Sequence, residues 1–217
     1  MTKAILQLTL KSAAAFGRGD GVPGLVDNEV DRDQYGLPFL RGRALKGLLA
    51  ESAENIIFAF SKQKVEKWRQ PKESLFGLPG SGLEGRGILH VGNGCLPKNL
   101  RDLILFRMKD PGPGDLSPSE VFEALTGIRR QTAVNHLGAP ERGSLRSLRV
   151  IIRGVVLEAP LIFNRSPTDD EWALLAGSVL GLRSGGLGRN RGRGRISAVL
   201  NDEATTRKFF EILATTE

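Results

Sequence analysis

Apolar residues at every second position open the chain. Leu6, Leu8 and Leu10 share one face of residues 4–10, which is the alternation of a half-buried strand. Over residues 43–60 the period changes to three or four, the spacing of one face of a helix. The apolar positions of this second stretch are Leu45, Leu48, Leu49, Ala53, Ile56, Ile57 and Phe60. The pattern predicts a strand and then, after a long loop, a strongly amphipathic helix.

The rest of the chain repeats both patterns. Its predicted elements are a strand near 87–92, a long strand over 149–163, a helix at about 169–182, a strand over 196–200 and a closing helix that carries Phe209, Phe210 and Leu213. Gly154 and Pro160 within the long strand indicate a bend and a sheet edge. Thr168 and Glu171 have the spacing of a capping box that opens the helix. The stretch 61–86 is predicted to be a connector.

The order strand, helix, strand, strand, helix, strand predicts the α+β class. It is the order of a ferredoxin-like or RNA-recognition βαββαβ fold, in which an antiparallel four-stranded sheet carries both helices on one face. Residues 11–41 and 97–148 lack a clean period and are predicted to be insertions into a single domain of residues 1–217. The aromatic signature of RNA-recognition modules is absent, so we do not expect bases to stack on the sheet.

Composition and charge narrow the class of partner. The 217 residues hold 31 Lys and Arg against 24 Asp and Glu, a net charge of +7, which favours RNA or DNA ahead of a membrane surface. One Tyr and two Trp are too few for a row of stacking rings, so we expect nucleotides to be held by their backbones. One Cys and two His exclude an intrachain disulfide and a recognisable zinc site. No signal peptide and no apolar run near 18 residues is evident, so we expect a cytoplasmic protein without a membrane partner.

The stretch 183–195 (Arg-Ser-Gly-Gly-Leu-Gly-Arg-Asn-Arg-Gly-Arg-Gly-Arg), here the Gly/Arg loop, is the strongest candidate for binding chemistry. It contains five Arg, five Gly and no acid. Glycine lets backbone N–H groups approach a phosphate closely, and arginine grips phosphate in two places. The candidate RNA-binding residues of this loop are Arg183, Gly186, Gly188, Arg189, Arg191 and Arg193. The alternative is a flexible, solvated basic loop, although this stretch connects two predicted regular elements.

A second cluster of cations opens the first helix. Arg41, Arg43 and Lys46 lie at or near its N-terminus, where unpaired N–H groups and the helix dipole already favour an anion. We interpret this glycine-flanked cluster as a second phosphate-binding site. The alternative is ordinary charge on a helix surface.

The long first loop carries five acids: Asp20, Asp27, Glu29, Asp31 and Asp33. An EF-hand counted from Asp27 needs Gly and Glu at its sixth and twelfth positions, and these positions hold Arg32 and Pro38. Asp also populates turns by bonding to its own backbone, so each acid taken singly favours a structural role. His90 lies in a strand pattern and favours a packed or surface role. His136 is either a hydrogen-bonded loop residue or a residue that contacts or cleaves RNA.

Four motifs, in this order across about residues 3–200, resemble those of CRISPR-associated RAMP proteins. Residues 38–47 (Pro-Phe-Leu-Arg-Gly-Arg-Ala-Leu-Lys-Gly) resemble the family's Pro-x-Ile-Pro-Gly-Ser-Ser-Leu-Lys-Gly. Residues 75–77 (Leu-Phe-Gly), followed by 87–90 (Gly-Ile-Leu-His), are similar to its Leu-Phe-Gly and the strand after it. Residues 126–133 down to 148–150 resemble its thumb hairpin, and the Gly/Arg loop resembles its C-terminal glycine-rich loop.

The resemblance is to the backbone subunit of type III effector complexes that cleaves target RNA. It implies a ferredoxin-like palm with fingers and a thumb, in a filament of copies along a guide RNA beside other CRISPR effector subunits. The helix start and the Gly/Arg loop would hold the guide, and the thumb, with Arg129 and Arg130, would interrupt the guide–target duplex. An aspartate before a Val-x-x-Asp stretch would cleave target RNA with a divalent metal, Mg²⁺. Residues 26–33 match that stretch, so the resemblance implies Asp27 as the catalytic residue.

The chain departs from the family pattern at two places. Arg43-Ala44 replaces the paired serines, and Glu29 stands where the family has proline. Three alternatives stay open beside the cleaving subunit. They are a scaffold subunit of the same complex without nuclease activity, a guide-RNA-processing endonuclease of the same superfamily, and a general RNA chaperone.

Overall fold

The computed structural model describes residues 2–60, 62–78, 85–109, 116–133 and 135–215. Its first strand, β1 (Lys3–Leu10), buries Ala4, Leu6, Leu8 and Leu10, while the residues between them remain at least partly exposed. This alternation confirms the half-buried strand that opens the chain.

β1 lies inside a four-stranded antiparallel sheet. The strand order is β2 (Leu89–Val91), β5 (Val156–Phe163), β1 and β6 (Ile196–Leu200). Leu6 of β1 is opposite Ala159 of β5 on one side and Leu200 of β6 on the other. The first core strand therefore lies between the third and the fourth, which is the ferredoxin-like order and confirms the α+β class.

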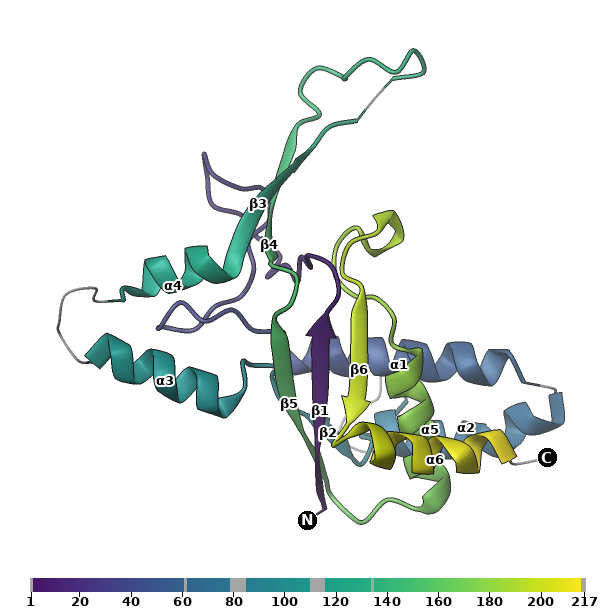
Figure 1. Ribbon diagram of the computed structural model, residues 1–217. Helices are drawn as coiled ribbons and strands as arrows, with labels where there is room; N and C mark the ends of the chain where they lie inside the picture. The colour runs from purple at the N-terminus through teal and green to yellow at the C-terminus, as the bar shows by residue number, and fades with distance from the viewer. Residues whose placement is uncertain (1, 61, 79–84, 110–115, 134, 216–217) are drawn as a thin grey trace.

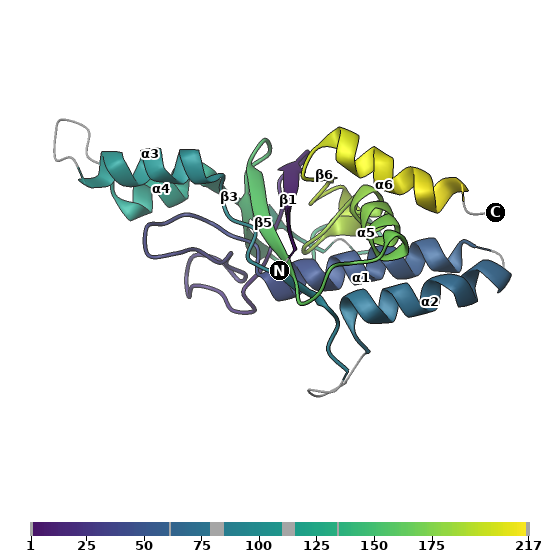
Figure 2. The same cartoon turned by 90° about the horizontal axis from the view of Figure 1, so that it is seen from below.

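Two helices pack on one face of this sheet, and two more pack against them (Figures 1 and 2). The inner pair is α1 (Gly42–Phe58) and α5 (Asp169–Gly181), and the outer pair is α2 (Lys62–Phe76) and α6 (Glu203–Thr215). The predicted capping box of α5 is present, with Thr168 and Glu171 each accepting the other's backbone N–H. The ring of Trp172 on α5 stacks on Phe209 of α6, with ring centroids 5.1 Å apart.

The predicted connector over 61–86 is wrong, because most of it is helix α2. Trp68, Pro71 and Leu75 are the buried residues of this helix among those whose side chains are described. Three buried positions among residues 65–76, the part of the helix whose side chains are described, make a narrow apolar stripe, and Pro71 inside the helix is locally a helix breaker. Residues 79–84 lie outside the described part of the chain.

The predicted long strand over 149–163 is also wrong as one strand. It is divided into β4 (Arg146–Ile151) and β5, and Gly154 turns the chain between them with a φ of +91°. The predicted bend at Gly154 is therefore confirmed. The sheet edge predicted from Pro160 is wrong, because β5 pairs with β1 on one side and β2 on the other. Pro160 lies one position beyond the three pairs that join β5 to β2, so its missing N–H removes no bond from that ladder.

The predicted insertion over 97–148 contains elements of its own. They are α3 (Lys98–Lys109), α4 (Pro118–Leu125), β3 (Thr126–Gln131) and the first residues of β4. β3 and β4 pair antiparallel as a separate two-stranded sheet, here called the hairpin, which projects away from the four-stranded sheet (Figure 1). Among the described residues, no helix combines the length and apolar character that a membrane span requires.

Candidate nucleic-acid interface

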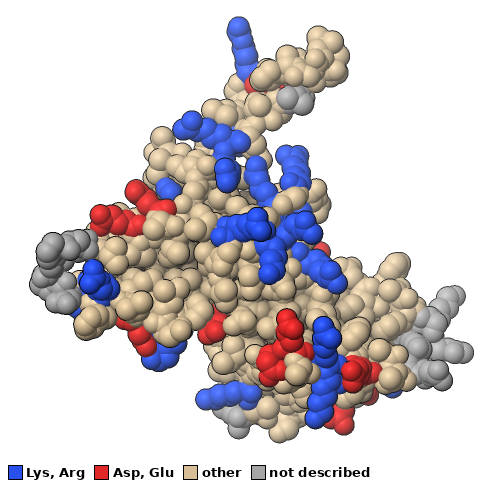
Figure 3. All heavy atoms as spheres, in the orientation of Figure 1, with Lys and Arg blue, Asp and Glu red and all other residues tan. Residues whose placement is uncertain are grey.

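The first loop, the hairpin and the Gly/Arg loop are distant in the sequence but meet at one groove. A groove of about 470 Å³ lies between Asn28 of the first loop, Gln131 and Leu148 of the hairpin, and residues 186–191 of the Gly/Arg loop. Figure 3 shows Lys and Arg gathered over the middle of this face and along the hairpin. Positive charge concentrated around a groove is the electrostatic footprint of a nucleic-acid site.

The Gly/Arg loop folds back on itself instead of extending into solvent. Ser184 forms a bridge with Arg195, and residues 189–191 make one short 3₁₀ turn. Gly186 packs against the first loop, because a Cβ there would lie 2.6 Å from the carbonyl oxygen of Ala15. A Cβ on Gly188 would meet only the Arg193 side chain. Gly186 therefore shapes the loop, and Gly188 leaves its backbone open to a ligand.

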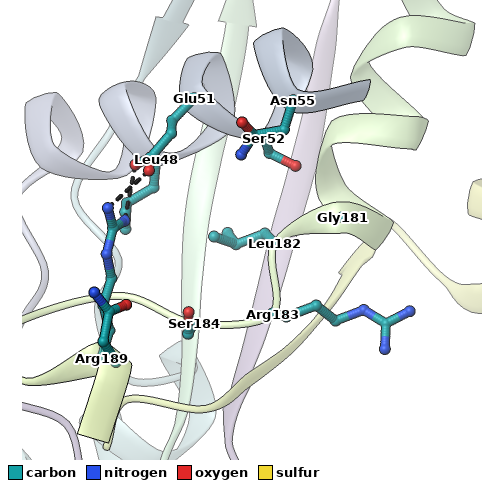
Figure 4. Close-up of a pocket in the computed structure, with 10 residues that line it drawn as sticks. Leu48, Glu51, Ser52, Asn55, Gly181, Leu182, Arg183, Ser184 and Arg189 are labelled. Atoms are coloured by element: carbon teal, nitrogen blue, oxygen red, sulfur yellow. Dashed lines mark hydrogen bonds and ion pairs between the residues drawn. The ribbon is translucent and has the colours of Figure 1, made fainter. Parts of the chain in front are cut away.

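The arginines of this loop differ in what they contact. Arg189 forms a bidentate ion pair with Glu51 of α1, with N–O distances of 2.8 and 2.7 Å (Figure 4). This hydrogen bonding raises the pKa of Arg189 and lowers the pKa of Glu51. Arg193 donates to the Gln131 side chain of the hairpin at 3.1 Å, and Arg183 donates to the carbonyl of Leu180. Arg191 is exposed.

The start of α1 faces the Gly/Arg loop across a second depression, here called the hollow. Arg41 and Ala44 of the helix and Gly186 and Leu187 of the loop line it together. Arg41 is bound to the Asp31 carboxylate by two contacts of 2.7 Å, and this pairing raises the pKa of Arg41. Its charge is therefore offset within the molecule.

The other two cations of the helix start have different surroundings. Arg43 is exposed, whereas Lys46 is half-buried. Burial lowers the pKa of Lys46, because a low-dielectric environment disfavours the charged form. An incoming phosphate would favour that charged form.

Asp27 lies beside the hairpin in a strand-like pairing. Its N–H donates to the Ser147 carbonyl at 2.8 Å, and its carboxylate accepts the Ser147 N–H at 2.6 Å. Ser147 is paired in turn with Arg130 of β3, and Leu148 with Arg129. Asp27, Ser147 and Arg130 thus form one row across the first loop, β4 and β3. Asp27, Arg129 and Arg130 are exposed.

The other four acids of the first loop are neutralised by arginines. The pairs are Asp20 with Arg18, Glu29 with Arg149, Asp31 with Arg41 and Asp33 with Arg101. This confirms the structural role expected for an acid taken singly. Asp27 instead contacts a backbone amide, and among the described residues no arginine forms an ion pair with its carboxylate.

A divalent metal bound at Asp27 would need further ligands from the RNA. The described residues contain no group of three His, Cys, Asp or Glu side chains placed to hold a metal. Mg²⁺ is commonly bound by one or two carboxylates together with substrate phosphates, and an exposed Asp27 at the edge of a basic groove fits that role. His90 on β2 and His136 in the hairpin are both exposed, and neither is among the residues that line the groove.

Sequence reasoning missed the link between the first loop and the base of the hairpin. The Glu29 carboxylate lies 3.0 Å from the Arg149 guanidinium, and the two residues are only 4% and 8% exposed. The guanidinium also covers the Phe122 ring, 4.9 Å from its centroid. The two residues are 120 positions apart, so no local spacing links them. The signal in the sequence was Glu29 itself, which stands where the family has proline.

Comparisons with known proteins agree with this architecture. A chain from the cryo-EM structure of type III-B Cmr-beta bound to cognate target RNA is 13% identical and covers 96% of this chain and 99% of its own length, with a TM-score of 0.65. A chain of the apo Cmr-beta structure gives 13% identity, 93% and 98% coverage and a TM-score of 0.63. A chain of a type IV-B CRISPR complex is 13% identical and covers 94% of this chain and 92% of its own length, with a TM-score of 0.58. At this identity the likeness concerns the fold.

The sequence itself carries the family relationship. No curated protein matches the chain. A profile described as the RAMP superfamily, however, matches residues 7–197, which run from β1 through the hairpin and the Gly/Arg loop into β6. The ferredoxin-like sheet, the inserted hairpin and this match lead to one conclusion: the chain belongs to the RAMP superfamily.

Proposed function

We propose that this chain is a backbone subunit of a type III CRISPR ribonucleoprotein, which binds guide RNA and cleaves complementary target RNA with Asp27. The observation that carries the proposal is the position of Asp27, an exposed carboxylate paired to the hairpin next to a basic groove. The fold likeness to chains of Cmr-beta, one of them bound to cognate target RNA, supports the class of complex. Copies of this chain and other effector subunits would be its protein partners.

The guide backbone would lie in the groove and along the start of α1. The exposed Gly188 and Arg191 of the loop, and Arg43 with Lys46 of the helix start, would supply phosphate contacts from both sides. Arg129 and Arg130 project from β3, where they would meet the guide–target duplex at the hairpin. Phosphate contacts fix register and carry no sequence information, which suits a protein whose specificity comes from base pairing with the guide.

The proposed reaction is attack of a ribose 2′ oxygen on the adjacent phosphorus of the target. The bond from the 2′ oxygen to phosphorus forms and the bond to the 5′ oxygen breaks, leaving a 2′,3′-cyclic phosphate and a 5′-hydroxyl. Asp27 accepts or orients the 2′-OH proton, and the leaving oxygen takes a proton from water. Alternatively, Asp27 would help to hold Mg²⁺, which would offset the charge that develops on the phosphate. The hairpin splays the nucleotide so that the three atoms fall in line.

Asp27→Ala tests this assignment in the assembled complex. We expect cleavage of complementary RNA to fall at least a hundredfold while guide and target binding persist, and a DNA target, which lacks the 2′-OH, to resist cleavage. Asp20→Ala is the matched control, because Asp20 lies in the same loop, is exposed and pairs with neighbouring Arg18. Unchanged cleavage by the Asp27→Ala complex would refute the catalytic role.

A scaffold subunit without nuclease activity is the second candidate. It is favoured by the Asp27–Ser147 bond, since a carboxylate that only completes the pairing with β4 would look the same. In that case the wild-type complex would hold the guide and leave target RNA intact. RNA that copurifies with the protein separates both candidates from a general RNA chaperone: short RNAs of uniform length with a shared 5′ sequence indicate a guide, and mixed RNAs indicate a chaperone.

A further inference from the structure

The hollow between the first loop, α1 and the Gly/Arg loop has the character of a small-ligand site. It encloses about 300 Å³. It adjoins the groove, because Asn28, Gly186 and Leu187 line both. An RNA backbone in the groove would therefore pass directly by its mouth.

The walls of the hollow are unsuited to phosphate. Its surface is mainly apolar, and its lining residues include Phe16, Leu40, Ala44, Leu48 and Leu187. The charged side chains that line it are Asp31 and Arg41, which neutralise each other. A phosphate placed here would lose its hydration against apolar side chains without gaining an unpaired cation. A flat, largely apolar ligand with a polar edge suits such a site better.

The polar side chains that line the hollow are those of Asn28, Asp31 and Arg41. The Asp31 carboxylate accepts hydrogen bonds and is held in place by Arg41, and the Asn28 amide both donates and accepts. A nucleobase presents donors and acceptors of this kind along its Watson–Crick edge.

Phe16 is an aromatic residue of the hollow, whereas the exposed rings of Phe58, Phe106 and Phe210 are not among the residues that line the groove or the hollow. Trp68 is inaccessible to solvent, and Trp172 packs between Phe163 and Phe209. A base that leaves the stack beside the groove would therefore find its apolar contacts in the hollow.

We propose that the hollow accepts one unstacked nucleobase of the RNA whose backbone occupies the adjoining groove. This inference rests on the proposed RNA-binding function and adds a base-binding site to it. Ala44 and Leu48, one helical turn apart on α1, form one wall, and Leu187 of the Gly/Arg loop forms the other. The small side chain of Ala44, where the family motif has a serine, keeps the hollow wide.

The test compares the wild-type protein with Ala44→Leu, which fills the hollow from the helix side. Gly47→Ala is the matched control, because a Cβ at Gly47 meets no atom within 4 Å. The probes are guide-length RNAs that carry a 2-aminopurine or an abasic site at each position in turn. For the wild type and the control, we expect one abasic position to weaken binding about tenfold and 2-aminopurine fluorescence to change there. In Ala44→Leu, an abasic site at that position should no longer weaken binding, and 2-aminopurine there should no longer change its fluorescence. The slope of log K against log salt should stay the same, because it counts phosphate contacts.

Each other outcome contradicts a different claim. If the wild type binds RNA with a steep salt slope but tolerates abasic sites everywhere, or if Ala44→Leu behaves like the wild type, no base enters the hollow and the proposed function stands. If the wild type binds no RNA, the proposed function fails and this inference fails with it. Leu187→Phe, which fills the hollow from the loop side at a partly exposed position, should reproduce Ala44→Leu and guards against a folding defect in that helix variant.

Discussion

Arginines of the candidate interface are paired with acids of the same chain. Arg41 is held by Asp31 and Arg189 by Glu51, each through two nitrogen–oxygen contacts. A guanidinium bound in this way can contact a phosphate only with its remaining N–H groups or after the acid is displaced. At the scale of single residues, the interface therefore has less unpaired positive charge than the sequence indicates.

Glu51→Gln should strengthen RNA binding. The substitution removes a negative charge beside the Gly/Arg loop and frees Arg189 for a phosphate. We expect the affinity for single-stranded RNA to rise severalfold and the salt slope to steepen by about 0.7, the value for one added phosphate contact, in a filter-binding titration. Glu54→Gln is the control on the same helix, since Glu54 pairs with Lys72 of α2. Equal or weaker binding by Glu51→Gln would mean that Arg189 has only a structural role.

At the scale of elements, the buried pair of Glu29 and Arg149 joins the first loop to the hairpin. Two backbone contacts continue the same connection: Arg149 N–H donates to the Asn28 carbonyl at 2.9 Å, and Asp27 N–H donates to Ser147. The loop that carries Asp27 therefore moves with the base of the hairpin. The proposed cleavage site and the element that would splay its substrate form one unit.

Glu29→Gln should destabilise the protein by about 3 kcal/mol, because it leaves the buried Arg149 charge without its partner. The double variant Glu29→Leu, Arg149→Met should recover most of this loss, since apolar side chains of similar size can replace a buried ion pair. Chemical denaturation measures both. Asp102→Asn, at the exposed pair with Lys98, should change the stability by less than about 0.5 kcal/mol. If Glu29→Gln lowered the free energy of unfolding as little as Asp102→Asn, the buried pair would not hold the loop.

Glu171 joins α5 to α2 and gives the fold a dependence on pH. Burial alone raises the pKa of Glu171, but hydrogen bonds from Arg165, Ser74 and the Thr168 N–H together lower it. A lowered pKa means that the stabilisation is present above the ordinary pKa of about 4.3 and is lost as the pH falls through the folded-state value.

Glu171→Gln should therefore cost stability at neutral pH and little in acid. We expect a loss of about 1.5 kcal/mol at pH 7, at the lower end of the range for charged hydrogen bonds because half of the Arg165 side chain is exposed. Thermal unfolding at a series of pH values should bring the two proteins together once the pH falls below the lowered pKa of Glu171. A difference that stays constant with pH would assign the loss to packing.

An element could be predicted where its own residues repeat a clear apolar period. β1, α1, α5 and β6 repeat an apolar period over their length, so the sequence predicted them and their order. α2 was missed because three buried positions and an internal proline leave little periodicity. β4 and β5 were merged because apolar residues continue across the turn at Gly154. The Gly/Arg loop and the α1 start were each predicted as phosphate-binding sites from local composition. The pairs of Glu29 with Arg149 and Glu51 with Arg189 depend on tertiary contacts that no spacing reveals.

At the scale of the whole molecule, the residues that stabilise the fold are separate from the projecting end of the hairpin. The core lies between the four-stranded sheet and α1 and α5, whereas the described residues of 132–145, at the far end of the hairpin, include no buried side chain. Hydrogen bonds at this end, such as those of Asn135 with Ala139 and Leu137, stay within the hairpin. Substitutions, deletions or insertions there leave the core packing intact, so mutation can vary the length and charge of the tip with little selection for folding. The part of the chain best placed to adapt to new nucleic acids or neighbouring subunits is therefore also the part that evolution can alter most freely.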